Sequence, residues 1–312
     1  MPFPLLTDLS HFGLLEFSGA DAREFLQNQL SCDVNALEPW QAQYGSYNTP
    51  KGRMLASFLL WRTADAYYMQ LPRSLCEPAR KRLAMYVLRA GVKIADVSND
   101  WALLGIAGPN TGSVLKGKIG TVPDSPMTMA MTENVVILKL DATRFLIVTP
   151  AADAERVRAA LGNSVEPAGH EAWDLLDIRA GIPFVLPETQ EQFVPQMANL
   201  DLIGGVSFSK GCYPGQEIVA RMHYLGKLKQ RMYLAHIETK QTPRPGDKVF
   251  SPALGEQAAG TIVNAAPAPE GGYDALAVLQ IESANAGDAH WKSLTGPPLR
   301  FKQLPYELPP AA

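Results

Sequence analysis

The chain has 312 residues, a formal net charge of −3 and a hydrophobic content of 46%, which together indicate a globular protein of two or three domains. The slight acidity gives no support to nucleic-acid binding through a basic face. Three widely spaced cysteines, Cys32, Cys76 and Cys212, argue against a disulfide framework and favour a reducing compartment. Since no apolar run approaches a membrane span and the first residues lack a signal peptide's basic segment, we expect a cytoplasmic protein without a membrane partner.

Predicted strands and helices alternate through the first half of the chain in two blocks of similar order. In the first block, strands are predicted at 14–17, 44–48, 54–61, 66–71 and 92–97. Helices are predicted to open at 18–21 and to cover 75–88. The second block has predicted strands at 101–107, 135–140 and 144–149 and predicted helices from Pro109 and over 151–161, and a further helix is predicted after it at 171–180. This order predicts two ferredoxin-like α+β lobes.

The rest of the chain is expected to form a long loop and a small β-barrel. Residues 187–205 predict a loop that apolar side chains keep ordered. From about Lys227, Pro and Gly separate short predicted strands at 232–237, 248–250, 260–264, 275–281 and 299–304. We therefore expect an α+β domain at 1–98, a second at 99–226 and a barrel at 227–312, with part of 170–226 packing on the first and a tail at 308–312 that frays.

The segment 210–221 (Lys-Gly-Cys-Tyr-Pro-Gly-Gln-Glu-Ile-Val-Ala-Arg) has the composition of a reactive thiol. Proline is favoured at the first position of a helix, so a helix is predicted to begin at Pro214 with Cys212 just ahead of it. The helix dipole and Lys210 would then stabilise a thiolate. The alternative is that Cys212 is a small buried hydrophobe, but its Gly, Pro and charged neighbours argue against a core position.

Four short motifs occur close together: Phe-Val-Pro-Gln at 193–196, Asn-Leu-Asp at 199–201, Gly-Val-Ser-Phe at 205–208 and the run 210–217. Together they resemble the YgfZ family of folate-binding proteins, which is related to the aminomethyltransferase (T-protein) of the glycine cleavage system. Residues 29–34 and 47–52 look like the first domain of that family, and the C-terminal strands look like its terminal barrel. The likeness covers most of the chain.

The resemblance implies a fold, a cofactor and a set of partners. The fold would be a three-part ring around a central folate pocket, and the cofactor would be tetrahydrofolate or a one-carbon derivative. The partners would be iron–sulfur client proteins, including enzymes that modify tRNA, or their assembly factors, with no direct contact to nucleic acid. The signature cysteine, here Cys212, would be needed for function.

The candidate site follows from the same motifs. Cys212 is the candidate catalytic thiol, and the candidate folate-binding residues are Lys51, Gln196, Asn199, Asp201, Lys210, Tyr213, Gln216, Glu217 and Arg221. Each has a plainer alternative. The lysines would be solvated loop residues, the Asn-Leu-Asp residues would form Asx turns, Glu217 would favour the first turn of a helix, and Arg221 would pair with it at i,i+4. For Cys32 and Cys76 we expect core packing, and the histidine spacing predicts no metal site.

Three functions from different classes remain open. The leading one is a tetrahydrofolate-binding protein that supports biogenesis or repair of iron–sulfur enzymes through the Cys212 thiol. The runner-up is a folate-dependent aminomethyl- or methyltransferase. The transferases place an acidic pair where this chain has 52–57 (Gly-Arg-Met-Leu-Ala-Ser), so we do not expect aminomethyl transfer of the usual kind. The third is a scaffold that holds a cluster at Cys212 together with a partner's ligands, since one thiol cannot supply four.

Overall fold

The computed structural model describes residues 3–309, so 310–312 of the segment expected to fray lie outside the described residues. The chain divides into two compact units, each built from separate segments. The first unit contains the residues up to Gln27 together with Val34–Gln43 and Phe58–Trp173. The second contains Asn28–Asp33, Tyr44–Ser57 and the residues from Asp174 onward. The three-domain division expected from the sequence stays a prediction.

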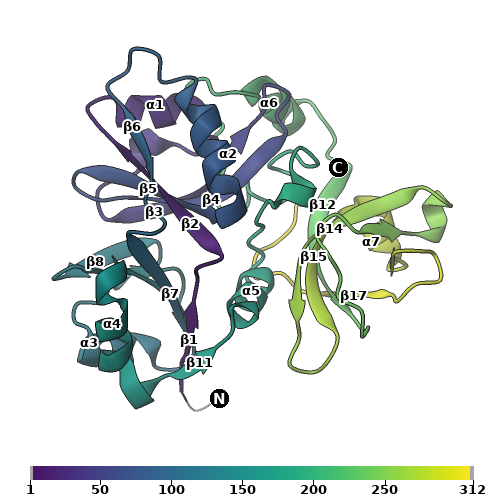
Figure 1. Ribbon diagram of the computed structural model, residues 1–312. Helices are drawn as coiled ribbons and strands as arrows, with labels where there is room; N and C mark the ends of the chain where they lie inside the picture. The colour runs from purple at the N-terminus through teal and green to yellow at the C-terminus, as the bar shows by residue number, and fades with distance from the viewer. Residues whose placement is uncertain (1–2, 310–312) are drawn as a thin grey trace. The chain divides into compact units, whose positions relative to one another are not determined.

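An eleven-stranded sheet runs through the first unit in the order β11-β1-β7-β10-β9-β8-β3-β4-β5-β2-β6 (Figure 1). Its strands are β1 (Leu5–Asp8), β2 (Phe12–Ser18), β3 (Gln41–Asn48), β4 (Met54–Arg62), β5 (Ala66–Pro72), β6 (Lys93–Asp96), β7 (Trp101–Ala107), β8 (Thr128–Thr132), β9 (Val135–Lys139), β10 (Arg144–Pro150) and β11 (Glu166–Ala168). Residues 44–48 of β3 and 54–57 of β4 count with the second unit. The strands of the two predicted lobes meet where Gln41 pairs with Thr128.

Helices of the first unit cover parts of this sheet. They are α1 (Ala22–Gln29), α2 (Arg73–Ala84), α3 (Thr111–Lys118) and α4 (Ala154–Leu161), with short 3₁₀ turns at Val34–Ala36, Ala151–Asp153 and Gly162–Ser164. Leu115 of α3 and Val157 of α4 join one buried apolar cluster with Ile106 of β7, which follows from the apolar spacing of these helices. The helix predicted from Pro109 begins later, at Thr111, because Asn110 is left-handed with φ 57°.

The second unit contains a six-stranded antiparallel sheet in the order β16-β13-β14-β15-β12-β17. Its strands are β12 (Gln230–Ile237), β13 (Lys248–Phe250), β14 (Ala258–Pro267), β15 (Tyr273–Gln280), β16 (His290–Trp291) and β17 (Leu299–Lys302). The predicted C-terminal strands are therefore present. A 3₁₀ turn (Pro252–Leu254) and helix α7 (Ile281–Ala286) complete this part, and Ile237, Val249 and Trp291 belong to its core.

Three further elements follow β11 in the sequence and precede β12: α5 (His170–Arg179), a 3₁₀ turn (Pro187–Thr189) and α6 (Gln216–Tyr224). The long loop expected at 187–205 is present and ordered. Its backbone turns on itself, since the amide of Leu200 donates to the carbonyl of Pro195 at 3.0 Å and that of Gly205 donates to Leu200 at 2.7 Å. Within residues 3–309, no helix combines the length and the apolar character that a bilayer crossing requires.

Candidate functional site

Of the three cysteines, Cys212 alone is exposed, whereas Cys32 and Cys76 are buried. Burial raises the pKa of the Cys32 thiol to about 12, and burial raises that of Cys76 to about 12 as well. The core role expected for these two residues is confirmed. The alternative of a buried Cys212 is wrong, and Cys212 is the accessible thiol of this chain. It lies in the segment 210–215, which we call the signature loop.

Lys210 anchors the start of that loop to residues far away in the sequence. Its Nζ donates hydrogen bonds to the carbonyl oxygens of Leu30 at 2.7 Å and Cys32 at 2.8 Å, and it lies 5.2 Å from the ring centroid of Tyr213. The side chain is buried, and burial lowers its pKa from 10.5 to about 8. The alternative of a solvated loop lysine is therefore wrong for Lys210.

Gly215 brings the signature loop against the 47–52 motif. It has φ +80°, and a Cβ there would lie 2.5 Å from the Cα of Gly52 and from the carbonyl oxygen of Thr49. Only glycine accepts both the left-handed backbone and this close approach. Lys51, the neighbour of Gly52, is exposed. Two motifs more than 150 positions apart in the sequence thus pack backbone to backbone.

The same glycine sets the start of α6. The helix begins at Gln216, not at the predicted Pro214, because Gly215 is left-handed and interrupts the helical backbone. Cys212 therefore lies four residues before the first helical residue. The favourable effect of a helix N-terminus on a charge falls off within one turn, so the predicted position directly ahead of the helix is corrected.

The first residues of α6 close the loop around Cys212. The amide Nε2 of Gln216 donates to the carbonyl oxygen of Lys210 at 3.4 Å, which joins the two ends of the loop. Glu217 and Arg221 are both exposed on the helix. Buried hydrogen bonds therefore hold the loop at Lys210, and the hydrogen bond between Gln216 and Lys210 joins its two ends. Cys212 lies between these two residues in the sequence.

Helix α6 exposes apolar side chains in its first turn and at its C-terminal end. Ile218, Tyr224 and the C-cap residue Leu225 are exposed, and we call these three the exposed apolar residues of α6. The ring of His223 stacks on that of Phe208, with centroids 3.7 Å apart and an angle of 15° between the planes. His223 is exposed, as expected for a surface histidine.

Asn199 and Asp201 tie the long loop to β12. The Nδ2 of Asn199, which is fully buried, donates to the carbonyl oxygen of Met232 at 2.8 Å. Both carboxylate oxygens of Asp201 accept hydrogen bonds from Arg231, at 2.7 and 2.9 Å. A bidentate pair of this kind fixes geometry as well as charge. These bonds order the loop, and the folate-binding roles of both residues stay predictions.

Several buried polar atoms near these motifs have no hydrogen-bond partner among the described residues. They include both amide atoms of Asn48, the Oε1 of Gln196 and the hydroxyl of Tyr213, whose pKa is raised by burial. The other amide atom of Gln196 donates to the carbonyl oxygen of Val219 at 2.6 Å. An unsatisfied buried polar group costs about 1–3 kcal/mol, so each is a candidate contact for a bound molecule.

Asn48 is the residue that the sequence analysis missed. It is 2% exposed and lies in the 47–52 motif. An antiparallel bridge between Leu30 and Tyr47 places it next to Gln29, whose Oε1 is also buried and has no partner among the described residues. An Asn at the end of a predicted strand was the available signal, but only the structure shows that its amide is left unpaired.

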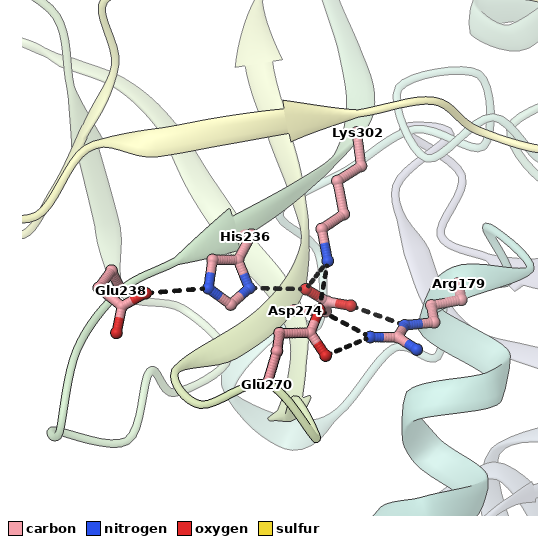
Figure 2. A network of polar contacts seen from close by, with 6 residues as sticks. All are labelled: Arg179, His236, Glu238, Glu270, Asp274 and Lys302. Carbon is pink, nitrogen blue, oxygen red and sulfur yellow. Dashed lines mark hydrogen bonds and ion pairs between the residues drawn. The ribbon is translucent and has the colours of Figure 1, made fainter. Parts of the chain in front are cut away.

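A separate polar cluster surrounds Asp274 in the second unit (Figure 2). The buried carboxylate accepts hydrogen bonds from Lys302 at 2.7 Å and from Arg179 at 2.7 Å, and its Oδ1 lies 2.9 Å from His236 Nδ1. Burial opposes ionisation of Asp274, but these partners outweigh it and lower its pKa. Glu270 contacts the same two cations.

Potential metal ligands meet in this cluster, although histidine spacing in the sequence gave no sign of them. One ligand atom each of His236, Glu270 and Asp274 lie within 4.8 Å of one another. A metal ion there would have to displace Arg179 and Lys302, which already neutralise the carboxylates. The cluster therefore acts as a link between α5 and the strands β12, β15 and β17.

Comparison with known proteins gives the family. The chain is 32% identical over 292 residues to the tRNA-modifying protein YgfZ of Colwellia psychrerythraea (strain 34H / ATCC BAA-681), which covers 92% of this chain and 88% of that protein. The chain belongs to the YgfZ family. A second member, from Sodalis glossinidius (strain morsitans), is 29% identical over 312 residues, with 99% and 94% of the two chains covered.

The YgfZ resemblance expected from the four motifs is thus confirmed, and so is the relation of the fold to the T-protein. The GCVT N-terminal domain matches residues 5–128. A crystal structure of glycine cleavage system aminomethyltransferase T from Bartonella henselae superposes with a TM-score of 0.80 at 20% identity, over 97% of this chain and 86% of that one. The α+β fold of the T-protein is present. The arrangement of lobes around a folate pocket stays a prediction.

The stretch 52–57, which matches the transferases' acidic pair in position but has no carboxylate, has a structural role in this chain. Leu55, Ala56 and Ser57 are buried. The hydroxyl of Ser57 donates to the carbonyl oxygen of Pro183 at 2.8 Å and accepts from the amide of Val185 at 2.9 Å. Ser57 therefore connects β4 to the segment 183–185, and these positions offer no carboxylate to a substrate amine.

Proposed function

We propose that this YgfZ-family protein binds tetrahydrofolate, or a one-carbon derivative of it, and supports the biogenesis or repair of iron–sulfur enzymes, including enzymes that modify tRNA. The observation that carries the proposal is an exposed thiol, Cys212, on a loop that is fixed by buried bonds from Lys210. The names of the curated relatives, tRNA-modifying proteins, and the T-protein fold support it.

The residues beside the loop suit a folate. A pterin ring presents donors and acceptors along one edge, and an amide side chain offers one of each. The unpaired amide of Asn48, the Oε1 of Gln196 and the hydroxyl of Tyr213 are the groups that would hold it. Bound tetrahydrofolate would supply a carrier for a one-carbon unit, while the chain positions that carrier and the thiol.

The thiol and the surface next to it suit a protein client. An accessible cysteine reacts with an oxidised group or binds iron as its thiolate, but a single thiol cannot hold a cluster by itself. The exposed apolar residues of α6 follow Cys212 in sequence, and large apolar side chains that are left exposed are available to contact a partner protein. We therefore assign Cys212 to a transient contact with a client, which supplies the remaining ligands.

The runner-up function is a folate-dependent aminomethyl- or methyltransferase, which the T-protein fold favours. The absence of a carboxylate at 52–57 weighs against it. Incubation with tetrahydrofolate and a panel of methylated and aminomethylated amines separates the two functions. Turnover of any amine at a rate that depends on Cys212 would replace the proposal by the transferase.

Calorimetry with tetrahydrofolate, carried out without oxygen, tests the folate part. We expect saturable binding to the wild-type protein and at least tenfold weaker binding to Asn48→Ala. The matched control is Asn163→Ala, which removes an exposed amide in the first unit and should bind as wild type does. Equal binding by wild type and Asn48→Ala would remove Asn48 from the site, and no binding to wild type would refute the folate proposal.

A further inference from the structure

A cavity of ≈ 250 Å³ in the first unit is walled by aromatic rings. Trp40, Trp61, Tyr68 and Trp101 all line it. The rings of Trp61 and Tyr68 are stacked with centroids 5.9 Å apart, and Trp101 meets Tyr68 edge-on at 6.1 Å. Three of the chain's five tryptophans therefore converge on one small space, which is separate from the Cys212 loop in the second unit.

The pairing of strands places these rings side by side. Trp61 of β4 lies directly opposite Tyr68 of β5, and Tyr68 lies opposite Glu16 of β2. Residues that face each other across antiparallel strands share one face of the sheet. The register of β4 and β5 therefore places the stacked rings of Trp61 and Tyr68 next to each other.

Trp40 is held in place from two sides. Its backbone is left-handed, with φ 66°, which is uncommon for a bulky residue. Its amide donates to the carbonyl oxygen of Arg62 at 2.7 Å, and its carbonyl accepts from the amide of Met129 at 2.8 Å. Strained backbone that the surrounding structure holds in place clusters at functional sites. The left-handed backbone of Trp40 therefore supports a binding role for this ring.

The charge at the cavity is negative. Asp65 lines it and is exposed, and burial together with Glu16 and Asp65 raises the pKa of Tyr68 to about 12. Among the described residues that line the cavity, none is Lys or Arg. A phosphate-bearing nucleotide would find no cation there, whereas a positive ligand would be attracted to the carboxylate.

We propose that this cavity binds a methylated ammonium group, with Trp40, Tyr68 and Trp101 around the methyl groups and Asp65 facing the charge, while the buried Trp61 supports Tyr68 by stacking on it. Aromatic faces attract such cations through their negative quadrupole, and cages of this composition bind quaternary ammonium ions. The methyl groups also fit the apolar wall, which a hydrated lysine ammonium does not. The proposal is independent of the folate and thiol functions assigned to the second unit.

The test compares two molecules of nearly the same shape. Choline carries a trimethylammonium group, and 3,3-dimethylbutan-1-ol replaces that nitrogen by carbon and is neutral. Titration of the full chain, followed by tryptophan fluorescence, should show saturable quenching by choline and at least tenfold weaker binding of the alcohol. Adenosine monophosphate is the third ligand and should not compete.

Two variants separate the charge from the rings. Asp65→Asn should weaken choline binding at least threefold and leave the alcohol unchanged, and Trp101→Leu should weaken both. Asp124→Asn, an exposed aspartate outside the cavity lining, is the matched control and should bind as wild type. Equal affinity for choline and the alcohol, no effect of Asp65→Asn, or preference for the nucleotide would each overturn the proposal.

Discussion

Gly215 packs against Gly52 with no room for a side chain between them, since a Cβ on Gly215 would come within 2.5 Å of the Gly52 backbone nitrogen. This contact joins the signature loop to the motif that holds Asn48. The thiol and the unpaired amide both belong to the second unit. The contact explains why the signature sequence needs a glycine directly before the first residue of α6.

Replacing Gly215 by Ala should therefore destabilise the second unit by about 1–3 kcal/mol, because the new Cβ collides with backbone atoms and the left-handed conformation is strained. Gly211→Ala is the matched control in the same loop, since a Cβ there meets nothing within 4 Å. Urea unfolding of both variants measures the difference. Equal stability of the two variants would show that the contact is not tight in solution.

The buried Lys210 predicts a rise of stability with pH. Its pKa falls from 10.5 to about 8 on folding because burial disfavours the charged form. Between these values the unfolded chain binds more protons than the folded one, so the free energy of unfolding increases as pH rises from about 8 to 10.5. Below pH 8 the lysine is charged in both states and contributes no slope.

The measurement is the difference in unfolding free energy between wild type and Lys210→Met at pH 7.5, 9 and 10, in which the titration of other groups cancels. We expect the difference to grow in favour of wild type by on the order of 2 kcal/mol across this range. Lys51→Met, which removes an exposed lysine, should show no such trend. A constant difference for Lys210→Met would mean that its ammonium is solvated.

Thiol labelling should distinguish the three cysteines sharply. Only the thiolate reacts, and burial raises the pKa values of Cys32 and Cys76 to about 12. Iodoacetamide at pH 8 should label Cys212 at least about a hundredfold faster than the other two, and Cys212→Ser should remove the fast phase. Mass spectrometry of digested protein reads the sites, with all three labelled in urea as the control. Rapid labelling of Cys32 in native protein would contradict its burial.

The cluster around Asp274 should stabilise the fold above the acid range. Because its carboxylate pKa is lowered in the folded state, its contribution is present above the unfolded pKa of about 3.9 and is lost as pH falls through the lower folded value. Asp274→Asn leaves Arg179 and Lys302 without a buried counter-charge and should cost about 2–4 kcal/mol at pH 7. Glu270→Gln, at the exposed rim, should cost clearly less. Equal losses of stability in the two variants would show that the exposed Glu270 contributes as much to the cluster as the buried Asp274.

Sequence reasoning located the elements that a strong apolar pattern defines. The strand at 101–107 and the one at 248–250 have the predicted bounds, since alternation and burial decide them locally. Strands β8 and β11 were missed because they are only five and three residues long, and β11 carries no β-branched residue. Helix α7 was not predicted, and its first residue, the apolar Ile281, was assigned to the preceding strand although Gln280 separates the two.

In the candidate site too, features set by neighbouring residues could be predicted from the sequence, and features set by tertiary packing could not. Exposure of Cys212 followed from its Gly, Pro and charged neighbours. The burial of Lys210 could not be predicted. Its partners are the carbonyl oxygens of Leu30 and Cys32, and every residue type has a backbone carbonyl, so the sequence does not indicate which one accepts a hydrogen bond. Asn48 was missed for a related reason, since an unpaired amide is a property of the packed chain.

The central claim is that the Cys212 thiol serves iron–sulfur enzymes. Cells that lack their own copy of this protein, complemented with wild type or Cys212→Ser at equal protein level, test it most directly through the product of an iron–sulfur enzyme that modifies tRNA. We predict that wild type and the control Ser209→Ala restore the modified nucleoside, and that Cys212→Ser does not, although it folds and binds tetrahydrofolate. Full restoration by Cys212→Ser would contradict the account.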